Sequence, residues 1–323
     1  MKTNDLDVAA RILRERDDFL LAGHVNPDGD SLGCICALLM FLRSLGKRAL
    51  AVSPEGVPEL YKFLPGSDLI RRSAPEGTRF GVGIAIDCES LDRLGPAQEL
   101  LSRCDCVMEI DHHPVVTQQS NCRLADSSAA SCGEIVLELL KKANAIITAE
   151  IAECLLTAIV TDTGSFRFSN VTPRTLRAAA ELMEAGASAS KVARRVYETR
   201  SLSSVRLLGM ALAGVQTVAS GRIAYASITR EHMDASEAAD AETEGIVNYV
   251  RAIRGAQVAI LFREGIDGTT RISFRSRDGL DVSQIAHLFG GGGHRTAAGC
   301  TVSAPLDQAI NLVVDAVQKW MES

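Results

Sequence analysis

The stretch FLLAGHVNPDGDS, residues 19–31, decides the fold of the first half of the chain, because an apolar run passes directly into a turn that carries acidic side chains and a histidine. Residues 19–23 have the continuous apolar character of a buried strand. The apolar residues 38–42 predict a helix after the turn, and Gly46 ends that helix. A buried strand followed by a helix is the first part of a βαβ unit.

The turn itself carries ligand-type side chains at alternate positions. If the turn is extended, His24, Asp28 and Asp30 share one side and aim at one region. We expect Ser31 to cap the helix that follows. Taken alone, the segment is explained equally well as an ordinary Asn-Pro-Asp-Gly turn that caps a helix.

Three further clusters of acidic residues and histidine lie in the first half of the chain. Asp87 closes an apolar run, Asp111-His112-His113 follows another, and Asp162 follows a third. The carboxyl ends of parallel strands meet at one edge of a sheet, so these side chains are expected to converge. Gathered carboxylates and imidazoles hold pairs of divalent cations, and a metal pair is suited to breaking phosphate esters. Read singly, Asp87 is also explained as a helix cap and Asp162 as the last residue of a helix.

Strand-like and helix-like segments alternate up to about residue 190, which predicts an α/β fold with a parallel sheet. In this part we expect further strands at 49–53, 82–87 and 106–111, and helices at 132–142, 148–160 and 172–184. A helix over 188–215 leads to a smaller mixed α/β domain, with strands at 223–228, 258–262 and 270–275 and helices at 240–253, 282–289 and 306–321. We therefore predict a catalytic domain at 1–190, a helical linker at 191–215 and a second domain at 216–323.

The composition is that of a soluble globular protein, with 46% apolar and 23% charged residues. There is no apolar run of the roughly 20 residues that a membrane-spanning helix needs, and the N-terminal residues lack the pattern of a secretory signal. The nine scattered cysteines are expected to be reduced, which predicts a cytoplasmic protein. The net charge of −6 argues against a basic track for long duplex nucleic acid but allows a short nucleotide.

The four clusters resemble, in order and spacing, the four motifs of the DHH phosphoesterase superfamily. The matching segments are HVNPDGD at 24–30, Asp87, DHH at 111–113 and TDTGSFRF at 161–168. Near the C-terminus, SFRS at 273–276 and GGGGHRTAAG at 290–299 resemble the DHH-associated nucleotide-binding domain. The two-domain layout is similar to that of the bacterial oligoribonucleases (nanoRNases), which also dephosphorylate 3′-phosphoadenosine-5′-phosphate.

This resemblance implies a site for two divalent ions, with Mn²⁺ as the expected ion and Mg²⁺ or Co²⁺ as substitutes. One ion would be held by His24, Asp28 and Asp87. The other would be held by Asp30, Asp87, His112 and Asp162. A water activated by the two ions would attack the phosphate.

The resemblance also implies roles for neighbouring residues. Asp111 would orient a ligand through a hydrogen bond, and His113 would contact the scissile phosphate or protonate the leaving oxygen. Asn26 would assist a water or the phosphate. In this set, no position departs from the family pattern, although a Ser or Thr expected near Cys132 is replaced.

The substrate would be gripped by residues of the second domain. By resemblance these are Arg275, Ser276 and His294, with the glycines of the tetraglycine run, Gly291, Gly292 and Gly293. Successive glycines present backbone amides to an anion, although a flexible connector explains a bare glycine run equally well. Arg167 either reaches the same substrate or lies outward in solvent.

The favoured function is hydrolysis of short oligoribonucleotides to 5′-mononucleotides and of 3′-phosphoadenosine-5′-phosphate to AMP. A RecJ-like single-strand exonuclease and a linear or cyclic dinucleotide phosphodiesterase keep the same catalytic half. A family II inorganic pyrophosphatase also has the Asp-His-His motif but lacks the glycine-rich histidine segment. A non-catalytic nucleotide sensor is the alternative of another class. No membrane partner is expected, and a homodimer is left open.

Overall fold

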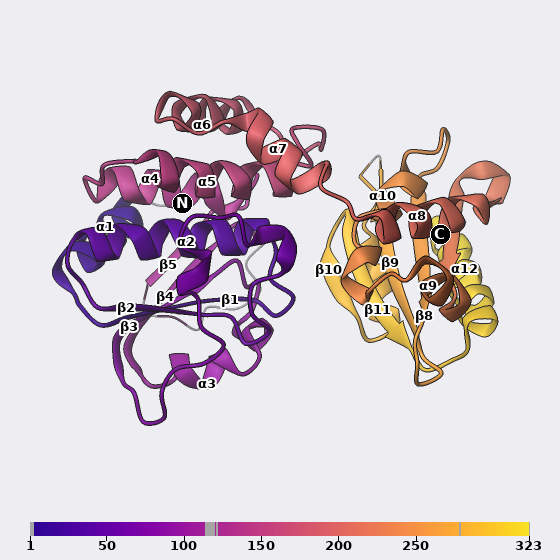
Figure 1. Ribbon diagram of the computed structural model, residues 1–323, viewed down its shortest axis with the longest axis horizontal. Helices are drawn as coiled ribbons and strands as arrows, with labels where there is room; N and C mark the ends of the chain where they lie inside the picture. The colour runs from indigo at the N-terminus through magenta and orange to yellow at the C-terminus, as the bar shows by residue number, and fades with distance from the viewer. Residues whose placement is uncertain (1–2, 114–119, 121, 278, 323) are drawn as a thin grey trace. The chain divides into compact units, whose positions relative to one another are not determined.

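The computed structural model describes residues 3–113, 120, 122–277 and 279–322. The chain divides into two compact units, Met1–Thr199 and Arg200–Ser323 (Figure 1). Each unit contains one β-sheet that is covered by helices, so the fold is α/β, as the sequence predicts.

The first unit is built on a parallel sheet. Within the described residues its strand order is β2-β1-β3-β4-β5, and every neighbouring pair is parallel. The strands are β1 (Phe19–Gly23), β2 (Ala49–Val52), β3 (Phe80–Ile86), β4 (Cys104–Asp111) and β5 (Cys122–Ala125). All five residues of β1 are buried, because helices cover both faces of the sheet.

Alternate residues of β1 enter two separate cores, as the period of two in a strand requires. Phe19 and Leu21 pack with the helices α1 (Thr3–Glu15), α2 (Gly29–Ser44), α4 (Cys132–Lys142) and α5 (Ala149–Asp162). Leu20 and Ala22 pack on the opposite face, where α3 (Ala97–Leu101) lies (Figure 1). The helices α6 (Pro173–Glu184) and α7 (Ala189–Tyr197) complete the unit.

The close contact between α2 and α5 depends on a glycine. A Cβ atom built on Gly33 would lie 2.4 Å from the carbonyl oxygen of Cys154, well inside van der Waals contact. Gly33 therefore lets the two helix backbones approach, and this approach fixes the end of α5 relative to the turn before α2.

The second unit is built on a mixed sheet with strand order β10-β11-β9-β8-β7-β6 in the described part. Only β7 and β8 pair in parallel there. The strands are β6 (Gln216–Val218), β7 (Ile223–Ile228), β8 (Val258–Glu264), β9 (Thr270–Ser276), β10 (Gly292–His294) and β11 (Ala297–Val302). One core contains residues of α8 (Leu202–Ala213), α9 (Arg230–Ser236) and α10 (Ile246–Arg251), and the other contains residues of α11 (Val282–Leu288) and α12 (Leu306–Glu322).

Two of the helices predicted from sequence are broken. The predicted helix over 188–215 consists of α7 and α8, and these helices belong to different units. The predicted helix over 240–253 contains a 3₁₀ turn at Asp240–Thr243 and then α10, because Gly245 takes a positive φ of 78° between them. The domain limits drawn at residues 190 and 215 remain predictions.

The other predicted helices and strands lie within a few residues of their predicted positions, but α1, α3, β5, β6, α9 and β10 are not evident from the sequence pattern. All nine cysteines are free thiols. Among the described residues, the helices are too short or too polar to cross a lipid bilayer.

Candidate metal centre

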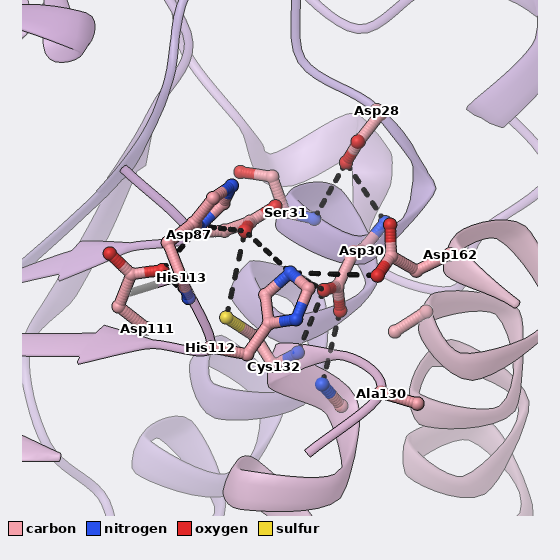
Figure 2. Close-up of polar contacts among 12 residues, drawn as sticks. Asp28, Asp30, Ser31, Asp87, Asp111, His112, His113, Ala130, Cys132 and Asp162 are labelled. Atoms are coloured by element: carbon pink, nitrogen blue, oxygen red, sulfur yellow. Dashed lines mark hydrogen bonds and ion pairs between the residues drawn. The ribbon is translucent and has the colours of Figure 1, made fainter. Parts of the chain in front are cut away.

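The acidic and histidine clusters of the first unit converge at the carboxyl ends of its central strands (Figure 2). His24 directly follows β1, Asp87 directly follows β3, and Asp111 is the last residue of β4. Since β1, β3 and β4 are neighbours in a parallel sheet, their carboxyl ends lie side by side. Asp162 reaches the same place from the last turn of α5.

One group of potential ligands consists of His24, Asp28 and Asp87. Nε2 of His24 lies 3.7 Å from Oδ1 of Asp28 and 3.6 Å from Oδ2 of Asp87. Asp28 is also the N-cap of α2, where its Oδ1 accepts hydrogen bonds from the backbone N–H groups of Asp30 and Ser31. The prediction that Ser31 caps this helix is therefore wrong, because the helix begins two residues earlier, at Gly29.

A second group consists of Asp30, His112 and Asp162. Nε2 of His112 lies 3.8 Å from Oδ2 of Asp30 and 3.5 Å from Oδ2 of Asp162. The same nitrogen is 3.6 Å from Oδ1 of Asp87. These three carboxylates come from three different segments of the chain, and Figure 2 shows them around the imidazole ring of His112.

Asp87 lies between the two groups. Its Oδ2 faces His24 and its Oδ1 faces His112, so that each carboxylate oxygen is directed at a different imidazole. The backbone of Asp87 has a φ of 59°, in the left-handed region that non-glycine residues seldom adopt. Such backbone strain is concentrated at functional sites, where the surrounding structure maintains it.

Asp30 is held by the first turn of α4. The backbone N–H of Cys132 donates to its Oδ2 at 2.7 Å, and the N–H of Gly133 donates to its Oδ1 at 3.0 Å. The helix N-terminus thus stabilises a carboxylate that is 1% exposed. The thiol of Cys132 lies 3.7 Å from Oδ1 of Asp87. The only sequence signal for this support is the predicted start of a helix at residue 132, which does not identify Asp30 as the partner.

The segment after Asp162 forms an unusual turn. Gly164, Ser165 and Phe166 have φ values of 54°, 60° and 61°, so three successive residues are left-handed. The side chain of Asn170 then donates from Nδ2 to the carbonyl oxygens of Asp162 and Ala130, both at 3.1 Å. Asn170 therefore connects the end of α5, which carries Asp162, to the segment before α4. The first backbone amides of α4 in turn bind the carboxylate of Asp30.

The protonation equilibria of the site reflect crowded negative charge. Burial would lower the pKa of His24, but the adjacent carboxylates of Asp28 and Asp87 raise it to about 10. Burial and the neighbouring carboxylate of Asp87 raise the pKa of Asp162 to about 7, although the positive charge of His112 opposes the shift. Burial and three nearby carboxylates also raise the pKa of Asp30. Bringing these acids together favours cations at the site.

The donor set fits divalent metal ions. The nitrogen–oxygen separations of 3.5–3.8 Å are too long for good hydrogen bonds. Ligand atoms bind such ions at about 2.0–2.2 Å, so two ligands of one ion are typically about 3–4 Å apart. Two groups with Asp87 between them have the spacing for two ions. Which residues ligate each ion remains a proposal.

His113 and Asp111 form a tight pair beside the two groups. The Nδ1–H of His113 and its backbone N–H both donate to Oδ1 of Asp111, at 2.6 and 3.0 Å. Burial would raise the pKa of Asp111, but its hydrogen bonds with His113 lower it. Nδ1 of His113 is also 3.6 Å from Oδ1 of Asp87, which connects this pair to the centre of the site.

Two other predicted residues lie on loops of the first unit. Asn26 is exposed, has a φ of 54°, and its backbone N–H donates to the carboxylate of Glu55. Arg167 is exposed, its Nε donates to the carbonyl oxygen of Gly164, and its guanidinium group lies 5.7 Å from the ring centroid of Tyr197. Arg167 therefore lies at the surface, beside the turn that follows Asp162, and its contact with substrate remains a prediction.

The predicted substrate residues of the second unit gather around β9 and β10. Arg275 lies on β9, where Ala297 of β11 pairs with it. Ser276 projects to the other face, is 2% exposed, and donates its hydroxyl hydrogen to the carbonyl oxygen of Leu280. An internal hydrogen bond therefore engages Ser276, whereas Arg275 is only partly buried.

Half of the tetraglycine run belongs to a strand, which argues against a purely flexible connector. Gly292 and Gly293 belong to β10, which pairs with β11, and Gly291 immediately precedes it. A Cβ atom on Gly291 would lie 2.1 Å from the carbonyl oxygen of Gly299, so the close approach of the backbones requires glycine. The backbone of His294 ends β10, and its side chain lies outside what the structure describes.

Comparisons with known proteins agree with this architecture. The model of the DHH family, N-terminal domain, matches residues 18–159, and that of the DHHA1 domain matches residues 220–323. The bifunctional oligoribonuclease and PAP phosphatase NrnA of Thermus thermophilus is 34% identical over 305 residues, which cover 93% of this chain and 89% of that protein.

Two solved structures extend the comparison. An exopolyphosphatase-related protein from Bacteroides fragilis has a TM-score of 0.93 and 25% identity, with 99% of this chain and 97% of that chain covered. RecJ of Thermus thermophilus in complex with Mn²⁺ has a TM-score of 0.57 and 13% identity, with 99% of this chain and 55% of that chain covered. The RecJ likeness concerns the fold alone. From the two domain matches and the extensive identity to NrnA, the chain belongs to the DHH family and carries a DHHA1 domain after its DHH domain.

Proposed function

We propose that this protein hydrolyses short oligoribonucleotides to 5′-mononucleotides, and 3′-phosphoadenosine-5′-phosphate to AMP, with two divalent metal ions. The observation that carries the proposal is the position of Asp87, whose two carboxylate oxygens face His24 of one ligand group and His112 of the other. The coarser statement, that the protein is a hydrolase of phosphoester bonds in nucleotides, follows from its membership of the DHH family and its likeness to NrnA.

In this proposal His24, Asp28 and Asp87 hold one ion, and Asp30, Asp87, His112 and Asp162 hold the other. Mixed carboxylate and imidazole ligands suit Mn²⁺ better than Ca²⁺ or Mg²⁺, and Co²⁺ is a reasonable substitute. When bound, a metal pair supplies Lewis-acid stabilisation of charge at the phosphate and lowers the pKa of a water nucleophile.

The remaining chemistry is assigned to the residues of this chain. The hydrogen bond to Asp111 fixes the ring of His113, so that Nε2 is the nitrogen that exchanges a proton or contacts the phosphate. Asn26, in the turn between β1 and α2, assists a water or the phosphate. In the second unit, Arg275, with its bidentate guanidinium group, and His294 bind the substrate, together with the backbone of Gly291, Gly292 and Gly293.

A product assay with the Mn²⁺-loaded protein tests the proposal. It offers 5′-labelled RNAs of two, three, five and twenty-four nucleotides, a matching single-stranded DNA, 3′-phosphoadenosine-5′-phosphate and pyrophosphate. We expect mononucleotides mainly from the shortest RNAs, and phosphate from the adenosine bisphosphate. Asp92→Asn is a suitable control because Asp92 is exposed and lies outside both ligand groups.

The other outcomes separate the alternatives. Cleavage restricted to long single strands would favour a RecJ-like exonuclease, and activity confined to dinucleotides would favour a dinucleotide phosphodiesterase. Release of phosphate from pyrophosphate alone would overturn the nucleotide assignment. Tight binding of nucleotides without turnover in saturating Mn²⁺ would indicate a sensor.

A further inference from the structure

A row of buried ionisable side chains lies directly beneath the Asp-His-His segment. Glu109 and Asp111 are two residues apart on β4 and therefore share one face of the sheet. Arg123 on β5 pairs in register with Glu109, so its side chain lies on the same face. The side chains of Glu109, Asp111 and Arg123 are 10%, 5% and 7% exposed. Burying three charged groups together is costly unless they compensate one another.

The contacts within this row continue from Glu109 through Arg123 and Asp111 to His113. Nε of Arg123 lies 3.2 Å from Oε2 of Glu109, and Nη2 of Arg123 lies 3.9 Å from Oδ2 of Asp111. The other oxygen of Asp111, Oδ1, accepts the two hydrogen bonds from His113. The carboxylate of Asp111 therefore faces the guanidinium group on one side and the imidazole on the other.

This arrangement determines how His113 is presented. An ionised carboxylate can only accept hydrogen bonds, so Nδ1 of His113 carries the hydrogen and Nε2 is left as the reactive nitrogen. The guanidinium group of Arg123 lies beside the oxygen of Asp111 that does not bond to His113, and its attraction restrains the orientation of that carboxylate. Glu109 in turn balances the charge of Arg123, whose guanidinium group lies between the two acids.

We propose that Arg123 is a positioning residue that acts through Asp111 on His113. The inference rests on the proposed function, in which His113 contacts the reacting phosphate. Stability alone does not account for the row, because a buried ion pair is often no more stabilising than apolar residues of similar volume. Residues that orient catalytic or ligating side chains commonly lie one layer behind them, as Arg123 does here.

A double-mutant cycle on the full-length, Mn²⁺-loaded protein tests the proposal. The four proteins are the wild type, Arg123→Met, His113→Asn and the double variant, and kcat and KM are measured on a diribonucleotide. We expect Arg123→Met to lower kcat by about tenfold, the range found for supporting residues around metal sites. In the His113→Asn background the same change should alter kcat by less than about twofold, because residues that act as a unit are not additive.

Mn²⁺ binding, measured by calorimetry, provides a readout that does not depend on turnover. The proposal expects Arg123→Met to bind Mn²⁺ with the stoichiometry and affinity of the wild type, since the two acids that Arg123 pairs with, Glu109 and Asp111, are not among the six proposed ligands. Arg123→Lys is the second variant. It keeps a positive charge beside Glu109 and should remain folded, but an ammonium group lacks the fork that reaches both acids.

Arg174→Met is the matched control, because Arg174 also joins carboxylates of different segments but has no described contact with His113 or Asp111. Its effect on kcat should be the same in the wild type and in the His113→Asn background. If Arg123→Met or Arg123→Lys also changes kcat by the same factor in the wild type and in the His113→Asn background, Arg123 has only a structural role and the inference is overturned. If His113→Asn alone leaves kcat unchanged, the role of His113 in the proposed function fails instead.

Discussion

Asp30 and Cys132 are 102 residues apart in the sequence and are joined by a hydrogen bond of 2.7 Å from the backbone N–H of Cys132 to Oδ2 of Asp30. The next amide of α4, that of Gly133, donates to the other oxygen. A potential metal ligand is therefore oriented by a helix N-terminus, which supplies two donors without a side chain. The position of α4 then determines the position of this carboxylate, and changes in α4 should affect the metal site.

The glycine at the start of α4 gives the first prediction. A Cβ atom on Gly133 would lie 2.8 Å from Cβ of Ala158 and 3.1 Å from the carbonyl oxygen of Leu155. Gly133→Ala should therefore push α4 away from α5 and lengthen the hydrogen bonds to Asp30. We expect weaker binding of one of two Mn²⁺ ions, by about 10–100-fold, in a calorimetric titration.

Gly209→Ala is the matched control for this substitution. Gly209 lies inside α8, and a Cβ atom added there would have no other atom within 4 Å among the described residues. Alanine at this position should stabilise the helix by up to about 1 kcal/mol and leave Mn²⁺ binding unchanged. Equal Mn²⁺ affinity in the two glycine variants would contradict the role assigned to the α4 N-terminus.

The shared carboxylate gives the second prediction. Asp87→Asn removes the charge that faces both His24 and His112. It should therefore weaken the binding of both ions and lower kcat/KM on the order of 1,000-fold. Asp28→Asn should weaken only one ion, because Asp28 belongs to one ligand group. Titrations that show one lost ion for both variants would argue against sharing of Asp87.

The third prediction concerns protons released when the metal-free protein binds Mn²⁺. A ligating imidazole must be neutral, but the pKa of His24 is raised to about 10 by the nearby carboxylates, so His24 is protonated at neutral pH. Asp162, with a pKa of about 7, is partly protonated there. Binding at pH 7 should therefore release at least about one proton per chain, and Mn²⁺ affinity should rise with pH.

Calorimetry in buffers of different ionisation enthalpy measures the number of protons released on Mn²⁺ binding. At pH 8.5 the contribution of Asp162 should be lost while that of His24 persists, since of these two groups His24 alone has a pKa above that pH. His24→Asn should remove about one proton from the total at either pH. Binding without proton release would show that His24 does not ligate the metal.

The fourth prediction concerns stability. Arg174 of α6 contacts Asp126, Glu134 and Glu138 at 2.6, 3.3 and 3.1 Å. Arg174→Met should lower the free energy of unfolding by about 2 kcal/mol at pH 7, the usual scale for charge-assisted hydrogen bonds.

The pH dependence of that loss has a definite sign. Burial would raise the pKa of Asp126, but hydrogen bonds from Ser128 and Arg174 lower it to about 2. The stabilisation that Asp126 contributes is thus present above its unfolded pKa of about 3.9 and is lost as the pH falls toward 2. The difference in the free energy of unfolding between wild type and Arg174→Met, measured with urea, should become smaller as the pH falls from 5 to 3. A constant difference would mean that Asp126 is not the relevant partner.

The sequence alone determined the fold class and the residues of the candidate centre. The apolar runs before His24, Asp87 and Asp111 have the length and continuity of buried parallel strands, and the ligand-type residues follow at their ends. Local chemistry is sufficient for such an inference, because the rule that sites form at the carboxyl ends of parallel strands does not depend on the details of packing.

Only the tertiary structure decided how those residues are supported. The hydrogen bonds from α4 to Asp30, the bridge made by Asn170 and the approach of Arg123 to Asp111 all join segments that are distant in sequence or lie on different strands. The start of α2 at Gly29 and the break at Gly245 also depend on backbone conformation that the sequence pattern does not specify. Hydrophobic periodicity records which face of an element is buried, but it carries no information on which polar groups then meet across the interior.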